Sequence, residues 1–180
     1  YNALTLEELK EFSRNIDIEQ SFNVNPEKRI TIDQFLQYLL SYAILERASD
    51  IHLLPNSNDM VRVAVRVMGV METLFYISYS TYNRLIRNIK TKSGMKESVV
   101  GTPQDGRIDG SVTLKSVDIN LNRPDAIVDA RYGLDENHLH YEFTKASFRV
   151  SAYPTEPIAV NFDVGNSFES LVLRVLNLSQ

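Results

Sequence analysis

The 180-residue chain contains no cysteine. Disulfide bonds and thiolate metal sites are therefore excluded, and the composition fits a reducing compartment such as the cytoplasm. No apolar run approaches the roughly 20 residues that a membrane-spanning helix needs, because the longest apolar-rich stretch, residues 35–45, is interrupted by Gln37 and Ser41. There is no signal-peptide pattern, and the first residue is Tyr1 rather than methionine, so we expect the sequence to be a piece of a longer protein.

An excess of positive charge is also missing. The formal net charge is −4, whereas a nucleic-acid-binding domain usually carries a strongly basic face, so no nucleic-acid partner is expected. Apolar residues make up 43% of the chain and charged residues 23%, which predicts a folded globular domain rather than a disordered one.

Two capping-box signatures predict where the first helices begin. Thr5 is followed three residues later by Glu8, and Thr31 is followed in the same way by Gln34. The first signature predicts a short helix over about 6–15. The second precedes apolar residues at helical spacing and predicts the main sheet-packing helix over about 32–47. We therefore divide the chain into an N-terminal helical extension or linker, residues 1–30, and a main domain, residues 31–180.

β-Strand signals begin after the second helix. A short strand is predicted at 51–54, and the β-branched run 61–67 predicts a hairpin with a return strand at 71–77. A third helix is predicted from Ser80 or Thr81 to Gly94, with its basic residues, Lys90 included, mostly on the polar side.

The last third of the sequence predicts more strands. The glycine-rich segment 101–110 is typical of a turn, and weak alternation over 112–121 and 140–153 predicts two strands. Residues 171–176 fit either a strand or a helix. The fold class predicted from these elements is α+β, a mostly antiparallel sheet with flanking helices.

Three short segments occur in an order that carries a resemblance to a known family. They are ASDIHLLP at 48–55, TPQDGRI at 102–108 and FRVSAYPT at 148–155, supported by VRVMGV at 65–70 and LRVL at 173–176. Together they resemble the N-terminal domain that precedes the motor core in the traffic ATPases of type II secretion and type IV pilus assembly. The resemblance implies a PAS-like sheet. It also implies a structural role for six motif residues: Ser49, Asp50, His52, Gln104, Asp105 and Gly106.

The sequence departs from the family pattern in three places. Met68 stands where the family usually has aspartate before the hairpin glycine, and segments 111–140 and 156–170 look like insertions.

The resemblance implies a homohexameric ring in which ATP lies between this domain and a core. The core would bring the phosphate-binding loop and the acidic ligands of Mg²⁺, and this domain would bring arginines. The chain has no GxxxxGK[ST] pattern, so no catalytic residue is assigned to it. By resemblance, Arg107 and Arg149 are the candidate contacts to the ATP phosphates. A guanidinium is planar and always charged, which suits phosphate oxygens. The local alternative is a salt bridge, for example from Arg107 to Asp105 or Asp109.

The resemblance also implies partners and a place in the cell. These are the chain's own C-terminal ATPase core, neighbouring subunits and the platform proteins of a pilus or secretion system, at the cytoplasmic side of the inner membrane. The alternative is a stand-alone PAS-like sensory or adaptor module that binds a small ligand or a protein. A conjugation or related secretion ATPase of the same superfamily is a third interpretation.

Several polar residues first receive structural interpretations. Asp50 is expected to bond backbone amides where helix turns to strand, and His52 to lie on a sheet face. His138 and His140 share one face of a predicted strand, and solvent exposure is favoured over metal binding for both.

Overall fold

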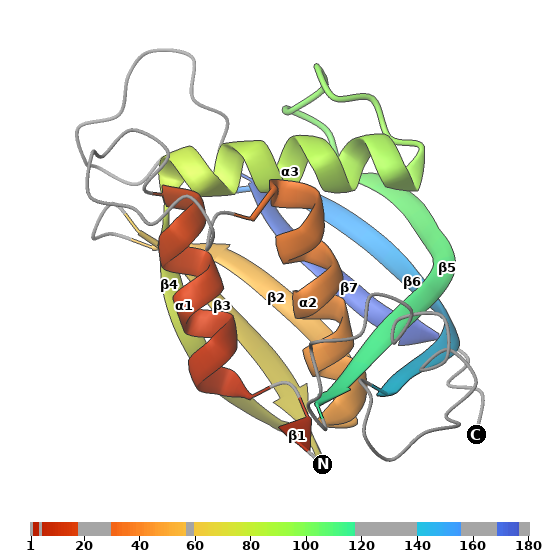
Figure 1. Ribbon diagram of the computed structural model, residues 1–180. Helices are drawn as coiled ribbons and strands as arrows, with labels where there is room; N and C mark the ends of the chain where they lie inside the picture. The colour runs from red at the N-terminus through yellow and green to blue at the C-terminus, as the bar shows by residue number, and fades with distance from the viewer. Residues whose placement is uncertain are drawn as a thin grey trace.

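The computed structural model describes residues 2–3, 5–17, 30–56, 60–117, 140–155 and 169–176. These residues form one antiparallel sheet with the strand order β1-β5-β6-β7-β2-β3-β4, together with three helices (Figure 1). The helices are α1 (Leu6–Asp17), α2 (Ile32–Leu45) and α3 (Tyr79–Ser93), and the strands are β1 (Asn2–Ala3), β2 (Asp50–Pro55), β3 (Met60–Val67), β4 (Val70–Ser78), β5 (Gln104–Val117), β6 (His140–Pro154) and β7 (Glu169–Leu176). The predicted α+β class with an antiparallel sheet is confirmed.

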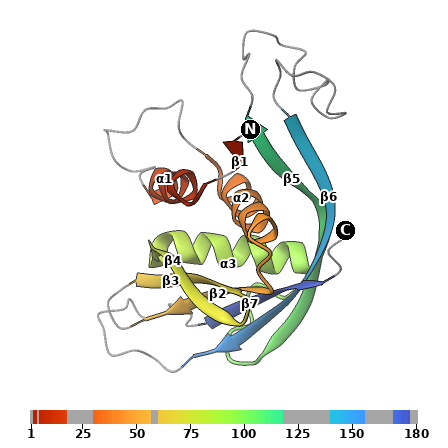
Figure 2. The same cartoon turned by 90° about the horizontal axis from the view of Figure 1, so that it is seen from below.

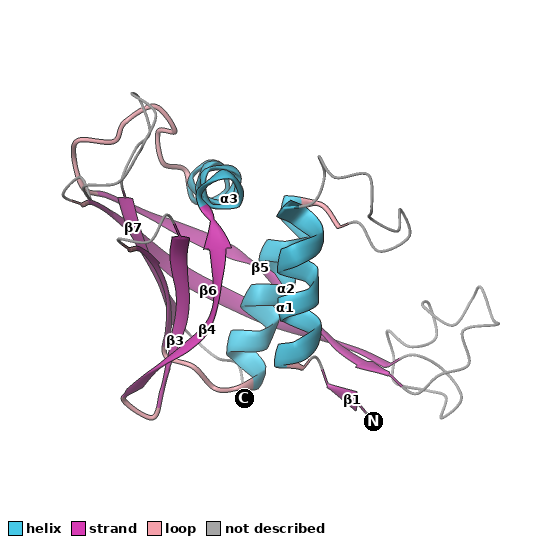
Figure 3. Ribbon diagram, turned by 90° about the vertical axis from the view of Figure 1, so that its left-hand side faces the viewer, coloured by secondary structure: helices cyan, strands magenta, loops and turns pink. Residues whose placement is uncertain are grey.

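All three helices lie on one side of the curved sheet (Figure 3). Figure 1 shows α1 and α2 side by side with α3 running across their ends, and Figure 2 shows β5 and β6 rising beside the helices. Alternation along β6 places the two faces: Phe148, Val150 and Ala152 are buried, whereas Arg149 and Tyr153 are exposed. We call the face of the sheet opposite these three helices the outer face.

Capping sets the helix ends. The Thr31 hydroxyl accepts a hydrogen bond from the Gln34 amide at 3.1 Å, and the Gln34 side chain accepts one from the Thr31 amide at 2.9 Å. Gly94 ends α3 in the left-handed conformation with φ 78°. The predicted start of α3 at Ser80 or Thr81 is wrong. Ser78 is the N-cap, because it is extended at the end of β4 and its hydroxyl accepts from the Thr81 amide at 3.1 Å.

The first helix packs on the second. Leu9 and Ile16 of α1 are fully buried in the same core as α2. The rings of Phe12 and Tyr38 are stacked, with centroids 4.5 Å apart. The predicted extension thus contributes apolar surface to the main domain.

Lys90 is not on the polar side of α3, as its helical spacing suggested. Its side chain is 2% exposed and forms an ion pair with Glu169, which is 0% exposed at the start of β7. Its Nζ also donates to the Val99 carbonyl at 3.0 Å. Burial raises the pKa of the neighbouring Tyr82 well above its ordinary value, and the charge of Glu169 adds to the shift. The prediction failed because Glu169, the first residue of β7, lies under this face of the helix.

The ambiguous segment 171–176 is a strand. It belongs to β7, which pairs with β6 on one side and β2 on the other. Leu171 and Leu173 face the core, and Arg174 faces outward. The described part of the preceding predicted strand ends at Val117, and its predicted continuation to 121 lies outside the described residues.

The β3–β4 hairpin turns at Met68 and Gly69. Both have positive φ, 52° and 80° respectively. Met68 is 95% exposed. A positive φ is uncommon for methionine, which has a Cβ, whereas glycine adopts it readily.

Candidate functional site

Three arginines lie side by side across three neighbouring strands on the outer face. Arg107 of β5 pairs in register with Arg149 of β6, and Arg149 pairs with Arg174 of β7. We call these three residues the arginine row. Side chains at such cross-strand positions lie about 5 Å apart at Cβ, so the three guanidinium groups start from neighbouring points on one surface.

Arg107 lies in a strand, so the predicted turn over 101–110 is wrong for the part that begins at Gln104. The glycine at 106 serves another purpose there. A Cβ added to Gly106 would lie 2.3 Å from the Ser93 carbonyl oxygen and 2.9 Å from the Ser93 Cβ. The glycine therefore lets β5 pass close under the end of α3.

Arg107 is engaged with neighbours on its own strand and the next one. Its Nε–H lies 2.8 Å from both Asp109 Oδ1 and Ser147 Oγ. The Ser147 hydroxyl in turn donates to Asp109 at 2.6 Å. Hydrogen bonds from Ser147 and Arg107 hold the pKa of Asp109 below its ordinary value. The salt bridge weighed as the local alternative for Arg107 thus forms with Asp109, while the Arg107 side chain stays 56% exposed.

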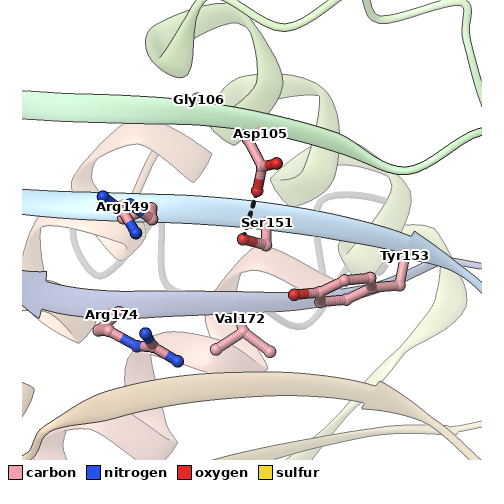
Figure 4. Close-up of a pocket in the computed structure, with 7 residues that line it drawn as sticks. All are labelled: Asp105, Gly106, Arg149, Ser151, Tyr153, Val172 and Arg174. Atoms are coloured by element: carbon pink, nitrogen blue, oxygen red, sulfur yellow. Dashed lines mark hydrogen bonds between the residues drawn. The ribbon is translucent and has the colours of Figure 1, made fainter.

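Arg149 and Arg174 are placed differently. Among the described residues, neither guanidinium has a carboxylate within salt-bridge distance, and both side chains are exposed. They line a pocket of about 500 Å³ on the outer face. Figure 4 shows the two guanidinium groups at one end of this pocket and the Tyr153 ring at the other. The remaining lining residues are Asp105, Gly106, Ser151 and Val172.

A polar pair lies between the two ends of the pocket. The Ser151 hydroxyl donates to Asp105 Oδ1 at 2.7 Å (Figure 4). The two residues are opposite each other on β6 and β5, two residues along each strand from the Arg107–Arg149 pair.

Asp50 lies on β2 opposite Arg174. Its carboxylate accepts from the Ser49 hydroxyl, contacts His52 Nε2 and lies 3.5 Å from Arg66 Nε. Partial burial raises the pKa of Asp50, but the hydrogen bonds from Ser49 and His52 and the charge of Arg66 outweigh burial, so the pKa lies below its ordinary value. Asp50 was expected to bond backbone amides. Its observed partners are side chains, because it points from the strand onto the outer face.

The motif residues around Asp50 hold three strands together. The Ser49 amide donates to the Arg66 carbonyl at 2.8 Å, and the Ser49 carbonyl accepts from the Val175 amide at 2.9 Å. His52 is partly buried on the sheet face, as expected.

Gln104, the first residue of β5, forms hydrogen bonds with the loop that follows α3. Its side-chain amide bonds the Lys96 amide at 2.9 Å, the Lys96 carbonyl at 3.0 Å and the Val99 carbonyl at 3.0 Å. It therefore fixes the loop that follows α3.

The structure brings together Arg149, Asp105 and Gly106 of the predicted site residues, with Arg107 beside them in the row. Sequence reasoning missed Arg174 and Tyr153. The signal for Arg174 was present, since the segment LVLRVL puts its single charged residue at an alternating position among apolar ones. What could not be read was which strand it would lie beside.

The residues described in the structure hold no cluster of three or more histidine or acidic side chains suited to a metal ion. His138 and the side chain of His140 lie outside the described residues. Within the described part of the chain, no helix is long and apolar enough to cross a membrane.

Comparison with known proteins gives matches over much of the chain. A family profile described as "Type II/IV secretion system protein" matches residues 25–127, more than half of the sequence. The type IV pilus assembly ATPase PilB of Thermus thermophilus is 30% identical over 89 residues, which cover 49% of this chain and 10% of that protein. The putative type II secretion system protein E of Escherichia coli is 28% identical over 119 residues, 64% of this chain and 24% of that protein. The chain spans only a small part, between a tenth and a quarter, of the two curated relatives named above.

A solved structure is also similar. The Legionella pneumophila ATPase DotB aligns with a TM-score of 0.44 and 18% identity, over 85% of this chain and 31% of that one.

Proposed function

Because this chain belongs to the type II/IV secretion system protein family, we propose that it is the regulatory domain that closes over a nucleotide held by a motor core. The arginine row is the single observation that carries this proposal. The core would correspond to a part of the longer relatives that this sequence does not cover.

The row fits an anionic ligand on physical grounds. Like charges placed directly opposite on a sheet destabilise it. Arg149 and Arg174 are adjacent and have no carboxylate within salt-bridge distance among the described residues, so their charges raise the energy of the free domain, and a bound phosphate would lower it. Charge develops on the transferred phosphoryl group in the transition state, and an arginine brought in by domain closure stabilises that charge.

We assign Arg107 and Arg149 as contacts to the ATP phosphates. Arg107 would exchange its bond to Asp109 for a phosphate oxygen when the domains close, which its exposure allows. The core would hold most of the ATP and, through its acidic residues, the Mg²⁺. Bound in this way, ATP and Mg²⁺ supply the phosphoryl chemistry, and the domain supplies positive charge and water exclusion.

The same proposal covers the assembly. The full protein would form a homohexamer in which this domain contacts its own core and a neighbouring subunit. It would act at the cytoplasmic face of the inner membrane, on the platform proteins of a type IV pilus or a type II-like secretion system.

The test is steady-state ATPase activity of the native full-length protein. Arg107→Ala and Arg149→Ala are compared with wild type and with the control Arg87→Ala, which removes an exposed arginine of α3 whose guanidinium faces Glu97 at 3.8 Å. We expect each row variant to lower turnover by about 10-fold or more, equivalent to about 1.4 kcal/mol of transition-state stabilisation. The control should keep wild-type turnover, and all melting temperatures should agree.

Unchanged turnover in correctly folded row variants would contradict the proposal. We would then favour the alternative function, a stand-alone PAS-like sensory or adaptor module.

A further inference from the structure

We propose that the outer-face pocket is a nucleoside-phosphate subsite. In it, Arg149 and Arg174 hold one phosphate group between them, and Tyr153 packs against the base. This inference rests on the proposed function and adds to it a further phosphate-binding residue, Arg174, and a direction for the nucleotide.

Charge compensation selects Arg149 and Arg174 within the arginine row. Arg107 already has a counter-ion, because its Nε lies 2.8 Å from Asp109 Oδ1. Arg149 and Arg174 are direct cross-strand neighbours, and no carboxylate among the described residues lies within salt-bridge distance of either. Each guanidinium carries five N–H donors and no acceptor, so a shared anion is the group that satisfies both.

The acid nearest to Arg174 in register does not serve as its counter-ion. Asp50 stands opposite Arg174 on β2, but its carboxylate is taken by Ser49, His52 and Arg66. The positive charge of the pair is therefore left for a ligand that comes from outside the described residues.

The opposite end of the pocket is aromatic. Arg149, Ser151 and Tyr153 occupy alternate positions of β6, so they share the outer face, and Cα atoms four residues apart on a strand are separated by about 13 Å. Tyr153 is 46% exposed, and Val172 adds an apolar side chain to the pocket lining. An exposed ring of this kind stacks on any nucleobase, because every base has a π-face.

The residues in the middle of the pocket set the direction in which the nucleotide would bind. The Asp105 carboxylate, held by Ser151, repels phosphate, so a phosphate is confined to the arginine end. A carboxylate accepts hydrogen bonds from ribose hydroxyls, as in dinucleotide-binding folds. Phosphate, ribose and base therefore meet Arg149 with Arg174, Asp105 and Tyr153 in that order (Figure 4).

The experiment is a titration of the 180-residue chain with ATP and, separately, with tripolyphosphate, followed by amide NMR shifts. The variants are Arg149→Gln, Arg174→Gln and Tyr153→Ala, with Arg87→Gln as the control for loss of one exposed arginine. We expect Arg174→Gln to weaken both ligands at least 5-fold. Tyr153→Ala should weaken ATP at least 3-fold and leave tripolyphosphate unchanged. Dispersed spectra of all variants verify that they are folded.

Three outcomes overturn the inference. If Arg149→Gln weakens ATP binding and Arg174→Gln behaves like the control, the phosphate pair is wrong while the proposed function stands. If Tyr153→Ala weakens both ligands equally or neither, the base is not on this ring. If the wild-type chain binds neither ligand at millimolar concentration, the pocket is not a nucleotide subsite. The proposed function is judged separately by the ATPase activity of the full-length protein.

Discussion

Lys90→Met is expected to lower the free energy of unfolding by about 3–5 kcal/mol, because removing one partner of a buried ion pair leaves the other charge uncompensated. The exposed fractions are 2% for Lys90 and 0% for Glu169, so water cannot replace the lost partner. Methionine keeps nearly the same length and volume, which limits any cavity. The Val99 carbonyl, now 3.0 Å from Lys90 Nζ, would also lose a donor.

A second variant separates the charge effect from packing. Lys90→Met combined with Glu169→Leu removes both ions, and replacing a buried pair by apolar residues of similar volume is often neutral or stabilising. We therefore expect the double variant to be more stable than the single one.

Equilibrium urea unfolding, followed by circular dichroism, measures both variants. For a chain of this size each kcal/mol shifts the melting temperature by about 2–4 °C, so the single variant should melt roughly 10 °C lower. A loss below about 1 kcal/mol in the single variant would refute the reasoning, and so would a double variant that is less stable than the single one.

Two further predictions concern the turn and the outer face. Met68→Asn should raise stability by about 0.5–1 kcal/mol, because asparagine tolerates the left-handed backbone of the hairpin turn better than methionine; urea midpoints at or below wild type would contradict this. Asp50 has a folded pKa below its ordinary value of 3.8, so its contribution is complete above that value and is lost as pH falls through the folded pKa. Asp50→Asn should therefore flatten the decline of wild-type stability below about pH 4, as measured by melting temperature against pH; identical slopes for both proteins would rule it out.

Local signals in the sequence were enough to place the start of α2 and the end of α3. The Thr31 capping box and the Gly94 cap depend only on residues within one turn, and both form as predicted. The error at Lys90 is of another kind. Helical spacing shows which residues share a side, but it does not show that Glu169, 79 positions later in the chain, will lie under that side.

In the candidate site, too, some features follow from local sequence and others depend on tertiary contacts. Motif resemblance selected Arg107 and Arg149, and the glycines around them suggested a turn. The need for Gly106 comes instead from Ser93, at the end of a helix that precedes it in the chain. Arg174 could be assigned to a face by alternation, but its place beside Arg149 depends on strand register. That register is set by tertiary burial of Leu171 and Leu173.

The pairing of β5, β6 and β7 has a practical consequence for protein engineering. The ladder itself holds the arginine row in register, since Arg107 pairs with Arg149 and Arg149 pairs with Arg174. A one-residue insertion or deletion within any of the three strands would shift that register and turn the following side chains to the other face of the sheet. An engineered variant that is meant to keep the three arginines together must therefore preserve the residue count inside each of these strands.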